Sequence, residues 1–181
     1  HPVQYYSPLF VRLAQQCNLK VFYTFGRAGY DSNYDEGFKM AIKWDIPLLK
    51  DYDYQFLQND ARRPGLNAFF GIDNPRLPDE IKKFNPDAIL VFGWSYKSHL
   101  AVLRHFKGKI PVWFRGDSTL LDEQGPIKRV LRKFLLSWVY SHVDKAFYVG
   151  TANKDYFKAF GMQESQLIFT PHAIDNERFA E

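Results

Sequence analysis

The stretch AILVFGWSYKSHLAVLRHFKGKIPVWFRGD, residues 88–117, decides the fold of this chain. It contains two solid apolar runs, at 88–94 and 110–117, which are typical of strands. The segment SHLAVLRHF between them predicts a helix. Strands that lack polar alternation are buried on both faces, as in a parallel sheet whose connections are helices. We therefore predict a strand, a crossover helix and a second, parallel strand.

The same alternation continues on both sides of this stretch. Further strands are predicted at residues 19–25, 145–150 and 166–171, and further helices at 79–84, 127–143 and 151–161. Gly161 is a typical helix stop. This pattern predicts an α/β fold, a Rossmann-like parallel sheet with helices on both faces. Residues 26–78 interrupt the pattern, and we interpret them as an irregular excursion with one or two short strands.

The segment 127–143 has the clearest helical periodicity in the chain. Apolar residues recur at the spacing of one face of an amphipathic helix: Ile127, Val130, Leu131, Phe134, Leu135, Trp138 and Val139. The same segment carries a basic face, made of Lys128, Arg129, Arg132 and Lys133. Ordinary solvation explains such a face, and peripheral contact with an anionic membrane surface is the alternative.

The first segment, HPVQYYSPLFVRLAQQC at residues 1–17, begins as a polar, aromatic loop and turns into a helix. We predict Ser7 as the N-cap and Pro8 as the first helical residue. One buried stripe is predicted from residues at helical spacing, namely Phe10, Leu13, Ala14 and Cys17. In open α/β sheets such a loop lies beyond the carboxyl end of a strand, where ligands bind. That strand is expected immediately before His1.

Length and composition predict one globular domain over residues 1–181, with 46% hydrophobic and 24% charged residues. The net charge of +4 permits anionic partners without requiring them. Basic residues are not grouped with exposed aromatics, which argues against a nucleic-acid-binding module. Cys17 is the only cysteine, so no internal disulfide forms and a reducing, cytoplasmic location is predicted. No signal peptide is visible and no apolar run reaches the roughly 18 residues of a spanning helix. Any membrane contact is therefore expected to be peripheral, at the inner face.

The predicted strands end at glycine or polar residues, and in a parallel sheet these ends meet at one edge. Arg115 and Asp117 lie at one such end. Asp117 could take a proton from a hydroxyl group, and Arg115 could bind a phosphate or pair with the aspartate. A structural ion pair, or an aspartate that caps the turn, explains the two residues equally well. His1 and His172 are further candidates for ligand contact, with a turn or core role as the alternative for His172.

Several other site classes are excluded by spacing. The chain contains neither the G-x-G-x-x-G dinucleotide fingerprint nor the phosphate-binding G-x-x-x-x-G-K-[S/T] loop. The segment Gly93-Trp-Ser95-Tyr-Lys97 lacks the second glycine of a nucleophile elbow. The five histidines and one cysteine show no metal-ligand spacing.

Taken together, HPVQYYSPLF, PDAILVFGW, IPVWFRGDS, YVGTANKDYF and TPHAIDNERF resemble the N-terminal half of a GT-B glycosyltransferase. More narrowly, they resemble glycosyltransferase family 4. In that family, Asn/His-x-x-Asp followed by Phe, here His172, Asp175 and Phe179, precedes the crossover into the second domain. The similarity extends over residues 1–181. Two departures are the loop HPVQYY in place of a glycine-rich loop, and Arg115-Gly-Asp117 where the family often has a histidine.

The resemblance implies a retaining, metal-independent hexosyltransferase with two Rossmann-like domains. This chain would be the acceptor-side domain, and a C-terminal domain, expected beyond Glu181, would bind the nucleotide sugar. The acceptor would be a glycan or a lipid-linked molecule. Its expected contacts are His1, Gln4, Tyr5, Trp94, Arg115 and His172, with Asp117 as the catalytic residue. The chain alone would need no cofactor and is expected not to catalyse transfer.

Two alternatives come from other functional classes. One is a stand-alone Rossmann-type or flavodoxin-type module that binds a nucleotide or a flavin. The absence of a glycine fingerprint argues against it. The other is a purely structural interaction domain.

Overall fold

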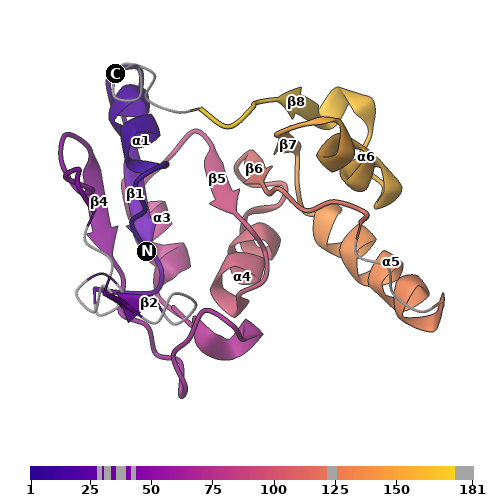
Figure 1. Cartoon of the computed structure of the whole chain (residues 1–181), viewed down its shortest axis with the longest axis horizontal. Coiled ribbons are helices and arrows are strands. Elements are labelled where there is room, and N and C mark those ends of the chain that lie inside the picture. Colours follow the sequence, from indigo (N-terminus) through magenta and orange to yellow (C-terminus); the bar gives the residue numbers. More distant parts are fainter. Residues whose placement is uncertain (28–29, 31–33, 36–39, 42–43, 122–125, 174–181) are drawn as a thin grey trace. The chain divides into compact units, whose positions relative to one another are not determined.

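The computed structural model describes residues 1–27, 30, 34–35, 40–41, 44–121 and 126–173. Helices alternate with parallel strands (Figure 1), which confirms the predicted α/β class with a Rossmann-like parallel sheet. The chain divides into two compact units, one containing His1–Pro75 and Ala173, the other Arg76–His172. We describe each unit by itself.

The second unit is a four-stranded parallel sheet with the strand order β5-β6-β7-β8. Its elements are α3 (Leu77–Phe84), β5 (Ile89–Phe92), α4 (Lys97–Phe106), β6 (Val112–Arg115), α5 (Pro126–Tyr140), β7 (Lys145–Tyr148), α6 (Thr151–Ala159), η2 (Glu164–Gln166) and β8 (Leu167–Phe169). Every strand and helix predicted from residue 79 onward is therefore present, with strands shorter than predicted. Gly161 follows α6 at a φ of +96°, as a helix stop requires.

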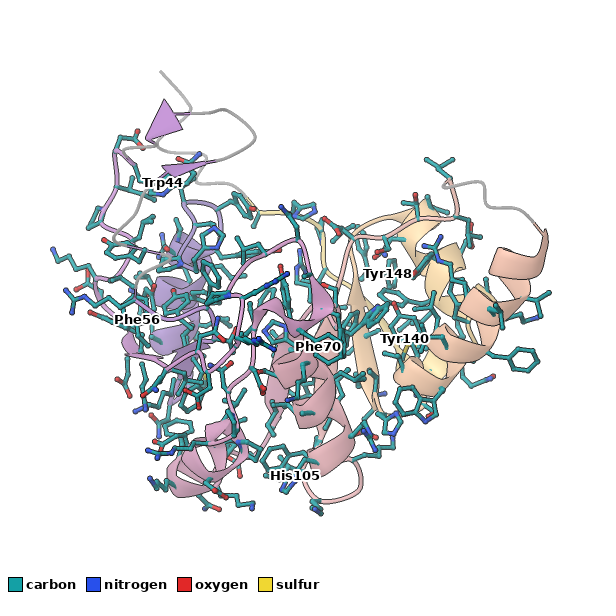
Figure 2. All side chains as sticks on the ribbon, turned by 90° about the horizontal axis from the view of Figure 1, so that it is seen from below. Trp44, Phe56, Phe70, His105, Tyr140 and Tyr148 are labelled. Atoms are coloured by element: carbon teal, nitrogen blue, oxygen red, sulfur yellow. The ribbon has the colours of Figure 1, made fainter. Side chains whose placement is uncertain are left out.

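One face of this sheet packs against helices. Val91, Phe114 and Ala146 are in register on β5, β6 and β7, and all three are buried. The ring of Phe114 lies 5.5 Å from that of Tyr140 in α5 and 6.0 Å from that of Phe157 in α6. Figure 2 shows Tyr140 between α5 and the strands. Strands that follow each other in order have right-handed crossovers on the same side, so α4, α5 and α6 cover this one face.

The opposite face of the sheet is less covered. Leu90 and Trp113 are paired in register on β5 and β6, and each is 36% exposed. Leu90 and Trp113 are thus more exposed than their neighbours Val91 and Phe114, although the apolar runs of both strands predict burial on both sides.

Helix α5 confirms the predicted helix but not the expected orientation of its apolar residues. Of the predicted apolar face, Val139 is buried, together with Leu136 and Tyr140, and the side chain of Ile127 lies outside those that the structure describes. The exposed apolar residues, which lie between 42% and 73% exposed, are Val130, Leu131, Phe134, Leu135 and Trp138. Five of the seven residues of the predicted apolar face are thus exposed, and the buried side of α5 contains Leu136 and Tyr140, which the prediction did not include.

Within its described residues, the first unit contains two small sheets. Its elements are α1 (Ser7–Ala14), β1 (Lys20–Tyr23), β2 (Tyr34–Asp35), β3 (Met40–Ala41), β4 (Asp53–Phe56) and η1 (Phe69–Gly71). Strands β1 and β4 pair in parallel, and β2 and β3 pair antiparallel. The predicted strand at 19–25 is thus confirmed as β1, and the described residues of the excursion 26–78 contain three short strands rather than one or two.

Two asparagines order the irregular part of this unit. The Asn74 amide donates to the carbonyls of Thr24, at 2.9 Å, and Gln58, at 2.7 Å, just after β1 and β4. The Asn59 amide nitrogen donates to the Gly71 carbonyl at 2.9 Å, and its oxygen accepts the Asp73 backbone N–H at 2.9 Å. Such side-chain amides satisfy backbone groups that no sheet or helix pairs.

The predictions for the first helix need correction. Ser7 is not the N-cap: Tyr6 holds that position and the helix begins at Ser7. The Ser7 backbone N–H and hydroxyl both donate to the Val3 carbonyl at 3.1 Å, because the chain already turns before Ser7. The expected buried stripe is also too long, since Phe10 is buried but Cys17 lies beyond the helix end and is exposed.

The two faces of α5 make a direct test of the fold. Leu136 is 1% exposed and Leu131 is 65% exposed, on the same helix. We expect Leu136→Ala to lower the free energy of unfolding by about 2–5 kcal/mol, because it leaves a core cavity. The matched Leu131→Ala is expected to change it by less than about 0.5 kcal/mol. Urea denaturation of both variants measures this. If both variants lost the same free energy of unfolding, Leu131 would be part of the core as Leu136 is.

Candidate ligand-binding cavity

A cavity of about 340 Å³ lies at the carboxyl ends of β5 and β6, within the second unit. Three groups of residues line it: Gly93, Trp94 and Ser95 after β5; Phe114, Gly116, Asp117 and Ser118 at the end of β6; and Arg132, Leu135, Leu136, Tyr140 and Tyr156 from α5 and α6. This is the edge of a parallel α/β sheet at which ligands commonly bind. The volume is that of a site for a small molecule.

Two glycines shape the edge of the cavity. Gly93 has a φ of +72°, which favours glycine, and its N–H donates to the Arg115 carbonyl at 2.9 Å. At Gly116, a Cβ atom would lie only 3.0 Å from the ring of Phe114. Both turns therefore bring backbone close to the cavity without a side chain in the way.

His99 in α4 fixes the first of these turns. Its Nδ1 lies 3.1 Å from the Gly93 carbonyl oxygen. A carbonyl only accepts, so Nδ1 carries the proton and donates. Burial lowers the pKa of His99, while its hydrogen bonds to the Gly93 and Phe92 carbonyls act in the opposite direction. The neutral ring is thus the form that holds the turn.

Aromatic side chains form the inner part of the cavity. Burial raises the pKa of Tyr140 far above its ordinary value, and Tyr156 adds to the shift through charge repulsion and a hydrogen bond. A hydrogen bond with Trp94 and the positive charge of Arg132 oppose it. The Arg132 guanidinium lies 5.9 Å from the centre of the Tyr156 ring. Tyr140 therefore remains a neutral hydroxyl that can donate or accept a hydrogen bond but does not act as a base.

The outer part of the cavity is polar. Asp117 is exposed and is the one carboxylate among the described lining residues; Arg132 is the one cation among them. The carboxylate of Asp117 has no hydrogen bond or ion pair with another described side chain. It is therefore available to accept a hydrogen bond from a bound hydroxyl group.

Asn153 in α6 positions the Asp117 turn, and the sequence analysis missed it. Its amide nitrogen donates to the Ser118 carbonyl at 2.8 Å, and its amide oxygen accepts the Val149 N–H at 3.1 Å. The side chain is 2% exposed. It thereby joins the loop after β6 to the loop after β7. An asparagine near the start of a helix often bonds to a nearby backbone group, as Asn153 does to Val149. The sequence around it does not show that its second partner is Ser118.

The structure brings together only part of the predicted site. Trp94 and Asp117 line the cavity. Arg115 does not, because neighbours along a strand point to opposite faces and Phe114 points to the helices. Its buried guanidinium donates to the Thr170 carbonyl at 3.0 Å and holds the chain after β8. His172 follows β8 as an exposed residue, and His1, Gln4 and Tyr5 belong to the first unit.

No protein-family model matches this chain, and no curated protein or solved structure matches it either. In the part of the chain that the structure describes, no group of three or more metal-ligating side chains comes together. None of the described helices is long and apolar enough to cross a membrane.

We expect Asn153→Asp to lower the free energy of unfolding by about 1–3 kcal/mol at neutral pH, because a carboxylate would face the Ser118 carbonyl. The deficit should shrink at acidic pH, where a protonated carboxyl group can donate. Urea denaturation across pH measures both effects. The control is the reverse change at an exposed position of the same helix, Asp155→Asn, which should have little effect. An Asn153→Asp protein as stable as the wild type would show that the hydrogen bond to Ser118 does not contribute to the free energy of unfolding.

The lowered pKa of His99 predicts a pH dependence. An unfolded chain protonates this histidine at about pH 6.5, before the folded chain does, so stability falls as the pH drops below that value. In His99→Gln this contribution is absent. The stability advantage of the wild type over the variant should therefore be smaller at about pH 5.5 than at about pH 8. Thermal unfolding at both values measures it, and an advantage that is independent of pH would contradict the prediction.

Proposed function

We propose that this chain is the acceptor-binding domain of a retaining glycosyltransferase, which moves a sugar from a nucleotide-sugar donor to a hydroxyl group of the acceptor. In this proposal the donor binds to a second, C-terminal domain of the same enzyme. Two arguments support it. The chain resembles the N-terminal half of GT-B enzymes in the order of its motifs, and the cavity lies where α/β folds bind ligands.

The observation that carries the proposal is the division of the cavity into an aromatic and a polar part. Trp94, Tyr140 and Tyr156 offer ring faces and hydroxyl groups. Ser95, Asp117 and Ser118 offer oxygen atoms at the rim. A sugar ring has the same two-sided character, with apolar C–H faces and hydroxyl groups at its edge. A few polar groups placed around an apolar wall are also what gives a ligand site its orientation.

Individual residues receive specific roles in this proposal. Trp94 packs against a ring of the acceptor, and Asp117 accepts a hydrogen bond from an acceptor hydroxyl group. If that hydroxyl is the nucleophile, the Asp117 carboxylate is placed to draw its proton away during transfer. Arg132 favours an acceptor that carries negative charge. Arg115 supports the sheet edge from the opposite face and does not touch the acceptor.

The proposal is tested by ligand-observed NMR with a panel of methyl hexosides and methyl N-acetylhexosaminides. We expect at least one of them to bind, and Trp94→Phe to weaken that binding by up to about tenfold, because part of the ring contact and the indole N–H are lost. Asp117→Asn should weaken it by several-fold, because a charge-assisted hydrogen bond is lost.

The matched control is Trp113→Phe, which changes a tryptophan on the other face of the sheet and should leave binding unchanged. If no glycoside of the panel binds, or if flavin mononucleotide competes for the cavity, a nucleotide- or flavin-binding module becomes the better interpretation.

A further inference from the structure

Arg132 brings a positive charge to the cavity that no described side chain of the protein pairs. It lies on α5, is half-buried, and is the one cation among the described lining residues. Its guanidinium lies over the ring of Tyr156, 5.9 Å from the ring centre, and in the described part of the chain it has no ion pair with a carboxylate. Removing a charge from water is costly unless an opposite charge accompanies it. Arg132 therefore offers its charge to a bound ligand.

The two charged residues of the cavity come from different elements. Asp117 follows β6, whereas Arg132 belongs to α5. No ion pair joins these two side chains in the described structure. One ligand can therefore contact both, with a hydroxyl group that donates to Asp117 and an acidic group that accepts from Arg132. Two polar contacts of opposite charge on an aromatic wall fix the direction in which the ligand lies.

The balance of charge indicates which acidic group fits. One cation and one carboxylate among the described lining residues leave no net charge. A carboxylate on the ligand brings a single negative charge, and its two oxygen atoms match the two parallel N–H groups of a guanidinium. A phosphate monoester carries about 1.5 to 2 negative charges at pH 7, which is more than Arg132 alone offsets. Asp117 would repel the excess, so the cavity favours a carboxylate.

We propose that the acceptor sugar is a hexuronic acid, whose C6 carboxylate binds Arg132 while a ring hydroxyl group binds Asp117. This assignment rests on the proposed function and names the class of sugar that the cavity accepts. Simple carboxylic acids have a pKa of about 4, so the group is ionised at neutral pH. Arg132 is then the residue that separates acidic from neutral acceptors.

The test is ligand-observed NMR with two matched pairs of glycosides: methyl glucoside with methyl glucuronide, and methyl galactoside with methyl galacturonide. The members of each pair differ only at C6, where the uronide has a carboxylate in place of a hydroxymethyl group. We expect at least one uronide to bind about tenfold or more tightly than its neutral counterpart, because a charge-assisted contact is gained.

Substitutions at Arg132 should remove this preference to different extents. In Arg132→Gln the two members of a pair should bind within about twofold of each other, because the charge is gone. Arg132→Lys should keep part of the preference, since the charge remains without the planar pair of donors.

The matched control is Arg104→Gln. Arg104 also lies over an aromatic ring, 5.4 Å from the centre of the Trp138 ring, but it is exposed on α4 and does not line the cavity. This variant should keep the full preference for the uronide. Far-ultraviolet circular dichroism checks that each variant is folded, and the comparison within each pair on the wild type needs no variant.

The assignment is overturned if the wild type binds both members of each pair equally, or if folded Arg132→Gln retains the preference. It is also overturned if glucose 6-phosphate binds more tightly than the uronides, because the cavity would then select the larger charge. All three results leave the proposed function standing as long as a glycoside binds. If neither the neutral glycosides nor the uronides bind, the proposed function fails as well.

Discussion

The packing of Phe114 is the interaction on which the second unit depends. This side chain of β6 contacts Tyr140 from α5 and Phe157 from α6, and so joins the middle of the sheet to both helices. The same ring forms part of the cavity wall, and it would have to shift to admit a side chain at Gly116, whose Cβ atom would lie 3.0 Å from it. Core and cavity are therefore not separate parts of the unit. A change at this one position would alter the support of the helices and the shape of the site together.

Handedness explains where the cavity and the exposed apolar residues of α5 lie. Because β5 to β8 follow one another across the sheet, their right-handed crossovers place α4, α5 and α6 on a single side. The helices can then bury only one stripe each. For α5 that stripe contains Leu136 and Tyr140, which also line the cavity. Val130, Leu131 and Phe134 of α5 are left exposed, whereas the Arg104 guanidinium of α4 lies 5.4 Å from the centre of the Trp138 ring.

The sequence predicts the elements of the second unit well, because strands and helices alternate in short, clearly bounded segments. It does not predict the orientation of α5, since periodicity shows that apolar residues share a face but not which face meets the sheet. Phe134 and Leu136 look alike in sequence and have opposite environments. Arg115 and Asp117 illustrate a similar limit: they are two residues apart, yet the strand ends between them and only Asp117 lines the cavity.

The contacts that position the site were the least predictable. His99 holds its turn through a hydrogen bond to Gly93, and Asn153 through one to Ser118. No periodic pattern in the sequence predicts either bond. Whether His1, Gln4 and Tyr5 contact the same ligand stays a prediction, because they belong to the other unit. Long-range partners of this kind follow from tertiary structure alone.

The strand order β5-β6-β7-β8 also has a consequence for how the chain reaches its native state. Each strand pairs with the one that precedes it in the chain, so every new pairing closes a short loop over a single helix. Each closure spans one crossover helix, so it costs less loop-closure entropy than a pairing that skips a strand, although parallel pairing is slower than the formation of local helical contacts. The sheet can grow from β5 toward β8 as the chain leaves the ribosome, one strand and one helix at a time.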